Sequence, residues 1–155
     1  MKISALLASI ALFFVLSMAL AVASTDHTST DFTSTYHASS DYVSGIVTHV
    51  VDGDTFNVQG FGQVSLALVN SPEMGTIEGV HAREYTMERL LDAVVFLDKD
   101  DLSGNYADGG IPCMVYLSGQ DGKPNLEKSF NRMIVDAGYA VIKNDMPSEF
   151  DPAQW

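Results

Sequence analysis

Between residues 43 and 69 the chain repeats short β-branched runs separated by tight-turn residues, and this pattern leaves few folds open. Asp52-Gly53 and the segment 60–62 separate the runs, which are VSGIVTHVV, TFNVQG and QVSLALV. Runs of this length, bounded by glycine and aspartate, predict strands joined by hairpins. We therefore expect the third run, residues 63–69, to form one continuous strand.

The rest of the chain alternates helical and extended patterns. The order of three strands, a helix, two strands and a helix predicts an α+β protein, with helices packed against a small closed barrel. The leading candidate is a five-stranded β-barrel of the oligonucleotide/oligosaccharide-binding (OB) fold with two to three packed helices. The predicted elements are helices over 79–92 and 125–138, strands over 94–98 and 111–117, a short extended piece over 139–142, and a last helical turn that lets Trp155 pack down.

The N-terminal part of the chain differs in composition from the rest. Residues 1–23 are apolar apart from Lys2 and a few serines and end in Ala21-Val22-Ala23, so they predict a cleaved signal peptide or an uncleaved N-terminal anchor. Residues 24–42 are rich in Ser and Thr and predict a linker, followed by a folded domain over 43–155. Both alternatives predict an extracellular protein, secreted or anchored at the cell surface, that meets a membrane only through its N-terminal segment.

The charge and the cysteine count restrict the partners and the source of stability. The formal net charge is -12, which disfavours nucleic acid as a partner at long range, although salt would screen this repulsion. Cys113 is the single cysteine and lies in the apolar run IPCMVYL. Without an intrachain disulfide the fold must depend on its core, and Cys113 is expected to be a buried apolar residue.

An acidic turn and a second polar turn carry the clearest motif. The order VVDGDTFNV … VSLALVNSPE … GYAVI resembles the staphylococcal nuclease-like, or thermonuclease, family over about residues 44–155. The segment FNRMIVDAGYAVI resembles the second helix of that family, and the tail SEFDPAQW is similar to its short archaeal-type members. The resemblance implies a secreted, calcium-dependent enzyme that hydrolyses DNA and RNA. Its carboxylates hold calcium, because a hard cation prefers oxygen ligands.

The resemblance assigns roles to five residues. Glu73 matches the catalytic glutamate that orients or deprotonates the attacking water. Asp54 matches the first calcium-binding aspartate, and Asp52 the acidic residue two positions earlier. Ser71 stands where the family offers a threonine carbonyl to the metal. Asn70 replaces a second aspartate and keeps an oxygen ligand without its charge, so calcium is expected to bind weakly.

The two phosphate-binding arginines of the family are not matched. Their positions hold Ser65 and Gly110, and no Lys or Arg lies between Lys99 and Lys123. Arginine binds and stabilises the transferring phosphate best, so their loss predicts weak or lost catalysis. Arg83 and Arg89 of the first helix are candidates to replace them, although a solvated helix face explains both.

Several alternatives stay open at this point. Without the family order around it, the acidic turn would be explained as an ordinary tight turn. The acidic segment DKDDLSGNYADGG is better explained as a solvated loop than as a second calcium site, because it lacks EF-hand spacing. The function is either residual phosphodiester hydrolysis or that of a non-catalytic cell-surface, structural or binding module on the same fold. The second alternative implies a protein partner or self-assembly.

Overall fold

The structure is a computed structural model that describes residues 42–155. The predicted signal or anchor (1–23) and all but the last residue of the predicted linker lie outside the described residues. Within 42–155, no helix is both long and apolar enough to cross a membrane. The elements are β1 (Val43–Val50), β2 (Thr55–Val58), β3 (Gly62–Leu66), β4 (Val69–Asn70), α1 (Ile77–Leu90), β5 (Val94–Lys99), β6 (Ile111–Leu117), α2 (Phe130–Asp136), β7 (Val141–Ile142) and the 3-10 helix η1 (Pro152–Gln154).

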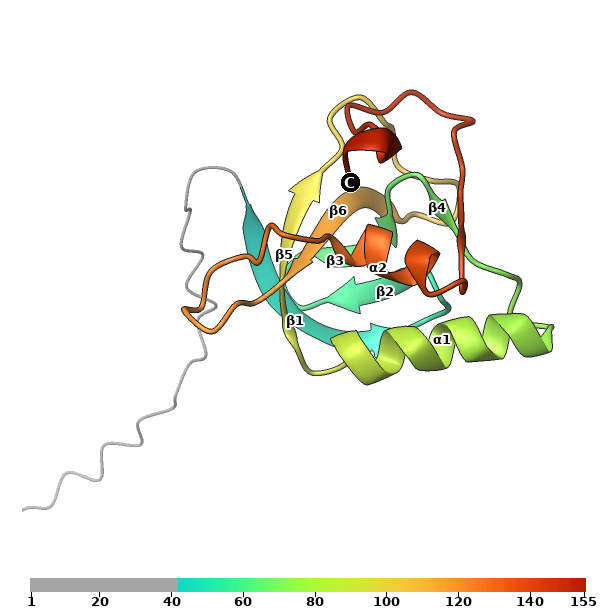
Figure 1. Cartoon of the computed structure of the whole chain (residues 1–155), viewed down its shortest axis with the longest axis horizontal. Helices are drawn as coiled ribbons and strands as arrows, with labels where there is room; N and C mark the ends of the chain where they lie inside the picture. The colour runs from blue at the N-terminus through green and yellow to red at the C-terminus, as the bar shows by residue number, and fades with distance from the viewer. Residues whose placement is uncertain (1–41) are drawn as a thin grey trace, which may run out of the picture. The chain divides into compact units, whose positions relative to one another are not determined.

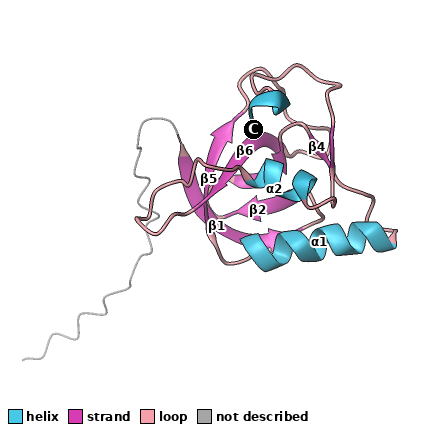
Figure 2. Ribbon diagram, in the orientation of Figure 1, coloured by secondary structure: helices cyan, strands magenta, loops and turns pink. Residues whose placement is uncertain are grey.

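Five strands close into a barrel in the order β1-β2-β3-β6-β5. Neighbouring strands are antiparallel except β3 and β6, which pair in parallel, with Ser65 opposite Pro112. Figure 1 shows α1 lying along one side of the barrel and α2 in front of it. This α+β arrangement, a closed mixed five-stranded barrel with two helices, is the OB-like fold that the sequence predicted (Figure 2).

The barrel interior and α2 share one apolar core. Phe56, Val64 and Val115 from the barrel and Phe130 and Ile134 from α2 are all fully buried and belong to the same cluster. Burial of such side chains contributes roughly 1.5–3 kcal/mol each. The core therefore supplies the stability that the chain cannot draw from disulfides.

Cys113 and Trp155 both take the places that the sequence predicted. Cys113 is fully buried, and burial raises the pKa of its thiol to about 12, so it is inert at neutral pH. Trp155 follows η1 and packs against the core cluster.

Two predicted elements are shorter than expected. The third strand ends at Leu66, because Leu68 adopts a left-handed conformation (φ 58°) and turns the chain out of the barrel. Val69–Asn70 then pairs with Val141–Ile142 as a separate two-stranded sheet. The second helix begins at Phe130 and not at Asn125, and the predicted helix over 125–129 is therefore wrong.

Capping explains where the second helix begins and ends. The Ser129 side chain accepts a hydrogen bond from the Arg132 N–H and so acts as the N-cap. The Asn125 side chain instead accepts from the Glu127 N–H in a local turn. Gly138 ends the helix at φ 78°, as the sequence predicted.

Candidate functional site

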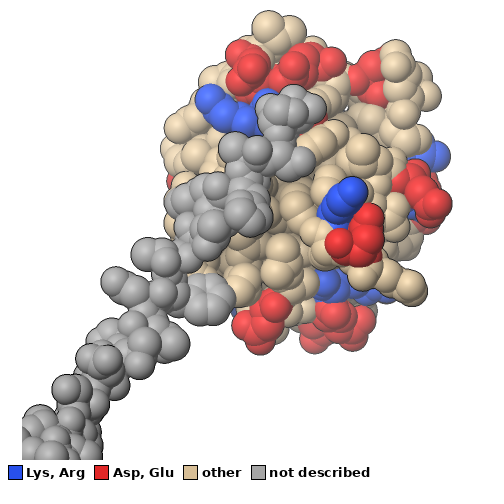
Figure 3. All heavy atoms as spheres, turned by 90° about the vertical axis from the view of Figure 1, so that its left-hand side faces the viewer, with Lys and Arg blue, Asp and Glu red and all other residues tan. Residues whose placement is uncertain are grey.

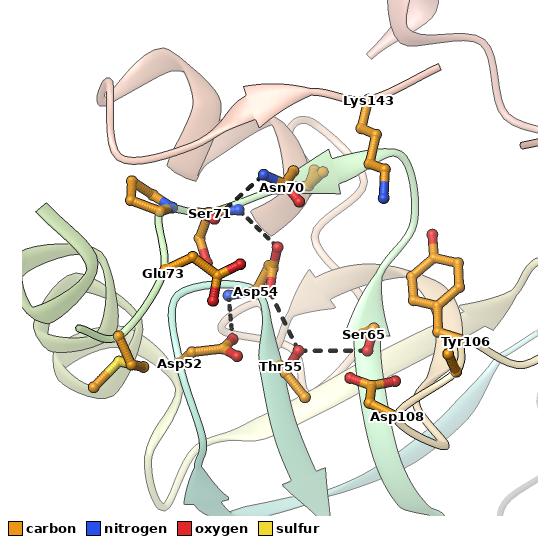
Figure 4. Close-up of a pocket in the computed structure, with 14 residues that line it drawn as sticks. Asp52, Asp54, Thr55, Ser65, Asn70, Ser71, Glu73, Tyr106, Asp108 and Lys143 are labelled. Carbon is orange, nitrogen blue, oxygen red and sulfur yellow. Dashed lines mark hydrogen bonds between the residues drawn. The ribbon is translucent and has the colours of Figure 1, made fainter. Parts of the chain in front are cut away.

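One end of the barrel carries a cavity of about 470 Å³ lined by segments far apart in the sequence. The lining comes from the turn at 52–55, from Ser65 in β3, from residues 69–74, from residues 106–108 and from Lys143. Figure 4 shows these side chains arranged around a common space. The cavity lies within the volume range of small-molecule sites.

The structure brings together most of the residues that the sequence singled out. Asp52, Asp54, Asn70, Ser71 and Glu73 all line this cavity. They come from two turns separated by β2 and β3, and Figure 4 shows the side chains of Asp52, Asp54 and Glu73 on the same side of the cavity. An ordinary tight turn would explain the acidic residues of the first turn, but not their convergence with the second turn.

Glycine at position 53 allows the acidic turn to lie close to its neighbours. A Cβ there would lie 2.6 Å from the Ser71 Cβ and 2.7 Å from the Ala82 Cβ. The Thr86 hydroxyl on α1 also donates to the Gly53 carbonyl at 2.6 Å. Helix α1 therefore holds the acidic turn against the segment around Ser71.

The Asp54 carboxylate is the centre of a hydrogen-bond network. Its Oδ2 accepts from the Ser71 N–H at 2.7 Å, and its Oδ1 accepts from the Thr55 hydroxyl at 3.2 Å. The Asp54 N–H donates to Asp52 Oδ1 at 3.0 Å. Burial, with the hydrogen bond and negative charge of Asp52, raises the pKa of Asp54 to about 7, while the Ser71 N–H acts in the opposite direction.

The oxygen donors of the cavity are of the chemical types that bind a hard dication. Two close carboxylates, an amide and a carbonyl are typical calcium ligands, and a dication would relieve the repulsion between Asp52 and Asp54. The Asn70 side-chain N–H donates to the Ser71 carbonyl at 3.3 Å, a bond that uses neither the Asn70 side-chain oxygen nor the second lone pair of the carbonyl. One observation makes the fit weak. Within residues 42–155, no three His, Cys, Asp or Glu side chains group so that they could hold a metal ion.

Glu73 stands at the exposed mouth of the cavity on a fixed backbone. Its carbonyl accepts from the Thr76 N–H at 3.0 Å and from the Thr76 hydroxyl at 2.7 Å. Thr76 is also the N-cap of α1, because its hydroxyl accepts from the Gly79 N–H. The start of the helix thus sets the position of Glu73.

Ser65 and Gly110, at the two unmatched arginine positions, are immediate neighbours. Ser65 lines the cavity and is almost fully buried, with its hydroxyl 3.5 Å from that of Thr55. A Cβ at Gly110 would collide with the Ser65 hydroxyl and lie 3.2 Å from Asp108 Oδ1. Any side chain at position 110 therefore requires Ser65 to move.

The cavity contains three residues whose place there the sequence did not reveal. Asp108 and Tyr106 line it from the loop between β5 and β6, and burial raises the pKa of Tyr106. Lys143 is the only lysine or arginine among the described residues that line the cavity. Lys143 reaches the cavity because the two-residue strands β4 and β7 pair, and the sequence has no clear signal for this pairing.

The arginines proposed as replacements are engaged elsewhere. Arg83 Nε donates to the Val50 carbonyl at 3.1 Å. Arg89 lies over the Tyr85 ring, 3.5 Å from its centroid, and donates to the Tyr85 carbonyl. Neither lines the cavity.

The acidic loop after β5 has a structural role at Asp100. This residue is fully buried, and its Oδ1 accepts from the N–H groups of Leu102, Ser103 and Glu149. It therefore organises its own loop and fixes the C-terminal tail. The segment is a loop, as the sequence predicted, but Asp100 within it is buried and not solvated.

Comparisons with known proteins leave the family open. No protein-family model matches the chain, and no curated protein matches it significantly. The fold and cavity define a small closed-barrel protein with an acidic pocket at one end. The thermonuclease resemblance stays a prediction based on the motifs.

Proposed function

We propose that this chain is an exported, thermonuclease-like phosphodiesterase that depends on calcium and acts slowly on DNA or RNA. The observation that supports it best is the convergence of Asp54, Asn70, Ser71 and Glu73 on one cavity. The resemblance requires these four positions to meet, and they come from separate turns of the chain. The closed OB-like barrel gives further support, because it is the fold that the resemblance implies.

In this proposal each residue has a separate task. Asp54, Asn70 and the Ser71 carbonyl would hold the cation, with Asp52 adding negative charge beside it. Bound calcium would supply positive charge to a phosphate oxygen and favour ionisation of water. Glu73 would accept the proton of the attacking water, and its exposed position at the mouth leaves room for substrate and solvent.

The expected rate is low because the cavity has no guanidinium. Loss of one group that stabilises transition-state charge typically costs a factor of roughly 100 to 1,000 in kcat. Ser65 and Gly110 leave both arginine positions without charge, and coupled losses do not simply multiply. We expect cleavage well below that of an enzyme with both arginines.

Digestion of single-stranded DNA by the purified protein tests this function. We expect cleavage in calcium, none in chelator, and loss of cleavage in Glu73→Gln. The matched control is Glu84→Gln, an equal change on α1 outside the cavity, which should cleave at the wild-type rate. Cleavage that persists in Glu73→Gln would contradict the role assigned to Glu73, since the reaction would then take place at another site.

A second candidate is a non-catalytic module on the same fold, with a protein partner or with self-assembly. Ser65 and Gly110 favour it, as do four carboxylates against one lysine in the cavity lining. This candidate predicts no wild-type cleavage above the Glu73→Gln background. It also predicts concentration-dependent assembly or a bound protein.

A further inference from the structure

We propose that Lys143 is the phosphate-binding group of this cavity and that the cavity takes one phosphodiester of a short nucleotide fragment. This inference rests on the proposed function and names the group that would contact the substrate phosphate in place of an arginine. A lysine there would bind the phosphate as a point charge, without the two-pronged geometry of a guanidinium.

Backbone hydrogen bonds fix the base of the Lys143 side chain beside the acidic half of the cavity. Strand β7 pairs with β4, with Val141 opposite Asn70. The Lys143 N–H then donates to the Leu68 carbonyl at 2.8 Å. The same small sheet that positions Asn70 therefore positions Lys143.

The side chain of Lys143 is directed over the cavity. Figure 4 shows its ammonium group reaching toward the hydroxyl of Tyr106, across the space from the carboxylates of Asp54 and Glu73. The cavity thus has an acidic half, suited to a cation, and a half with an ammonium and a phenol. A phosphate held in the second half would contact Lys143, beside the residues that would hold a cation.

Lys143 is free to exchange its present partner for a phosphate. Its Nζ lies 3.3 Å from Asp145 Oδ2, with 48% of the Lys143 side chain and 59% of the Asp145 side chain exposed. Exposed ion pairs of this kind contribute about 0–1 kcal/mol, whereas a charge-assisted bond to phosphate in a partly enclosed site is stronger. Asp145 therefore competes with the phosphate but does not block it.

The size and charge of the cavity limit the part of a substrate that it can hold to a short fragment. About 470 Å³ accommodates roughly a nucleotide unit, and a single lysine can neutralise one phosphate charge. The net charge of -12 opposes the approach of further phosphates. A dinucleotide, which has a single internal phosphodiester, is the smallest probe that meets these limits.

Calorimetric titration of the full-length protein with a deoxydinucleotide, in calcium, tests the inference. We expect Lys143→Gln to lower the affinity about five- to tenfold and Lys143→Arg to retain it. Asp145→Asn should raise the affinity, because it removes the competing carboxylate. Lys123→Gln is the matched control, since Lys123 is exposed and lies outside the cavity.

Calcium titration without nucleotide separates a direct role from a structural one. Removing the positive charge of Lys143 should leave calcium affinity unchanged or raise it, whereas a disturbed cavity would lower it. The inference would be overturned if the wild type does not bind the dinucleotide, or if Lys143→Gln binds it as tightly as the wild type does. It would also be overturned if Lys123→Gln lowers the affinity as much as Lys143→Gln does. A parallel loss of calcium affinity in Lys143→Gln would overturn it as well.

The two proposals fail in different experiments. If the dinucleotide binds through Lys143 but single-stranded DNA is never cleaved, the inference stands and the hydrolase function falls. If cleavage depends on calcium and Glu73 while Lys143→Gln binds and cleaves normally, the function stands and the inference falls.

Discussion

A single buried amide, that of Asn131, joins three parts of the molecule. Its Oδ1 accepts from the Val115 N–H at 3.0 Å, and its Nδ2 donates to the carbonyls of Ala67 and Cys113 at 3.0 and 3.1 Å. Asn131→Leu would leave the buried Val115 N–H and the Ala67 carbonyl without these bonds, while the Cys113 carbonyl keeps its bond from the Ala67 N–H at 2.9 Å. We therefore expect a loss of about 2–4 kcal/mol in the free energy of unfolding. Urea denaturation measures it, and the exposed Asn105→Ala should change stability by less than about 0.5 kcal/mol.

At the same scale, Asp100 predicts how stability depends on pH. Burial alone would raise its pKa, but hydrogen bonds from the Ser148 side chain and from the N–H groups of Glu149, Ser103 and Leu102 lower the pKa overall. In the unfolded chain an aspartate has a pKa of about 3.9. The stabilisation is therefore complete above that value and is lost as pH falls through the lower folded-state pKa.

The pH prediction is tested by comparing unfolding curves at a series of pH values. Asp100→Asn should be less stable than the wild type at pH 7, and the gap should narrow as the pH falls below about 4. Asp121→Asn, in the exposed loop after β6, is the control for loss of one negative charge. A gap between Asp100→Asn and the wild type that stays constant down to pH 2 would contradict the role assigned to this carboxylate.

At the scale of elements, helix α1 holds the site together. At Gly79 the helix lies tightly against the backbone of Pro72 and Glu73. A Cβ at Gly79 would collide with the Glu73 backbone carbonyl and lie 2.8 Å from the Pro72 carbonyl oxygen. In an open helix, Gly→Ala stabilises by up to about 1 kcal/mol. Here we expect Gly79→Ala to destabilise by about 1–3 kcal/mol, because backbone must move.

The sign of the Gly79→Ala effect distinguishes tight packing from helix propensity. Denaturant midpoints measure the effect, and Gly75→Ala is the control because a Cβ there meets nothing within 4 Å. Calcium-dependent cleavage should fall in Gly79→Ala under folding conditions, since the Pro72–Glu73 segment is displaced. A stabilised Gly79→Ala would show that the helix shifts without cost.

The sequence predicted those elements whose signals are local. Each of the five barrel strands combines β-branched residues with a glycine, proline or aspartate boundary, and the sequence predicts all five, although the third ends at Leu66 and not at residue 69. The two-residue strands β4 and β7 exist only because distant segments meet, so neither periodicity nor propensity could reveal them. Lys143 was missed for the same reason, whereas the acidic turn was found because its motif is contiguous.

Helix α2 and the site also show that local sequence patterns do not reveal features that depend on capping or on distant contacts. The amphipathic pattern extends back to Asn125, but the cap at Ser129 and the local turn at Asn125 end the helix earlier than periodicity indicates. The convergence of Glu73 with Asp54 followed from the family resemblance and not from spacing. Their hydrogen bonds and burial depend on contacts between segments distant in the sequence, which no local pattern encodes.

At the scale of the whole molecule, four of the seven lysines and arginines in residues 42–155 form ion pairs with carboxylates. Lys128 and Arg132 both contact Asp136, at 2.8 and 2.6 Å, and Figure 3 shows basic groups beside acidic ones on one face and not in a patch of their own. With a net charge of -12, the protein has no long-range attraction for a polyanion. This sets it apart from proteins that hold nucleic acid through a basic surface.

The acidic charge predicts an unusual salt dependence for the proposed reaction. The Debye length falls from roughly 30 Å at 0.01 M to about 8 Å at 0.15 M salt, so added salt screens the repulsion between protein and DNA. We expect kcat/KM for long single-stranded DNA to rise severalfold over this range, with calcium kept saturating at each salt concentration. A dinucleotide substrate, with one charge, should respond much less. A steep fall with salt would instead mean that several lysines or arginines bind phosphates along the strand, and substrate binding would then extend beyond the Lys143 cavity.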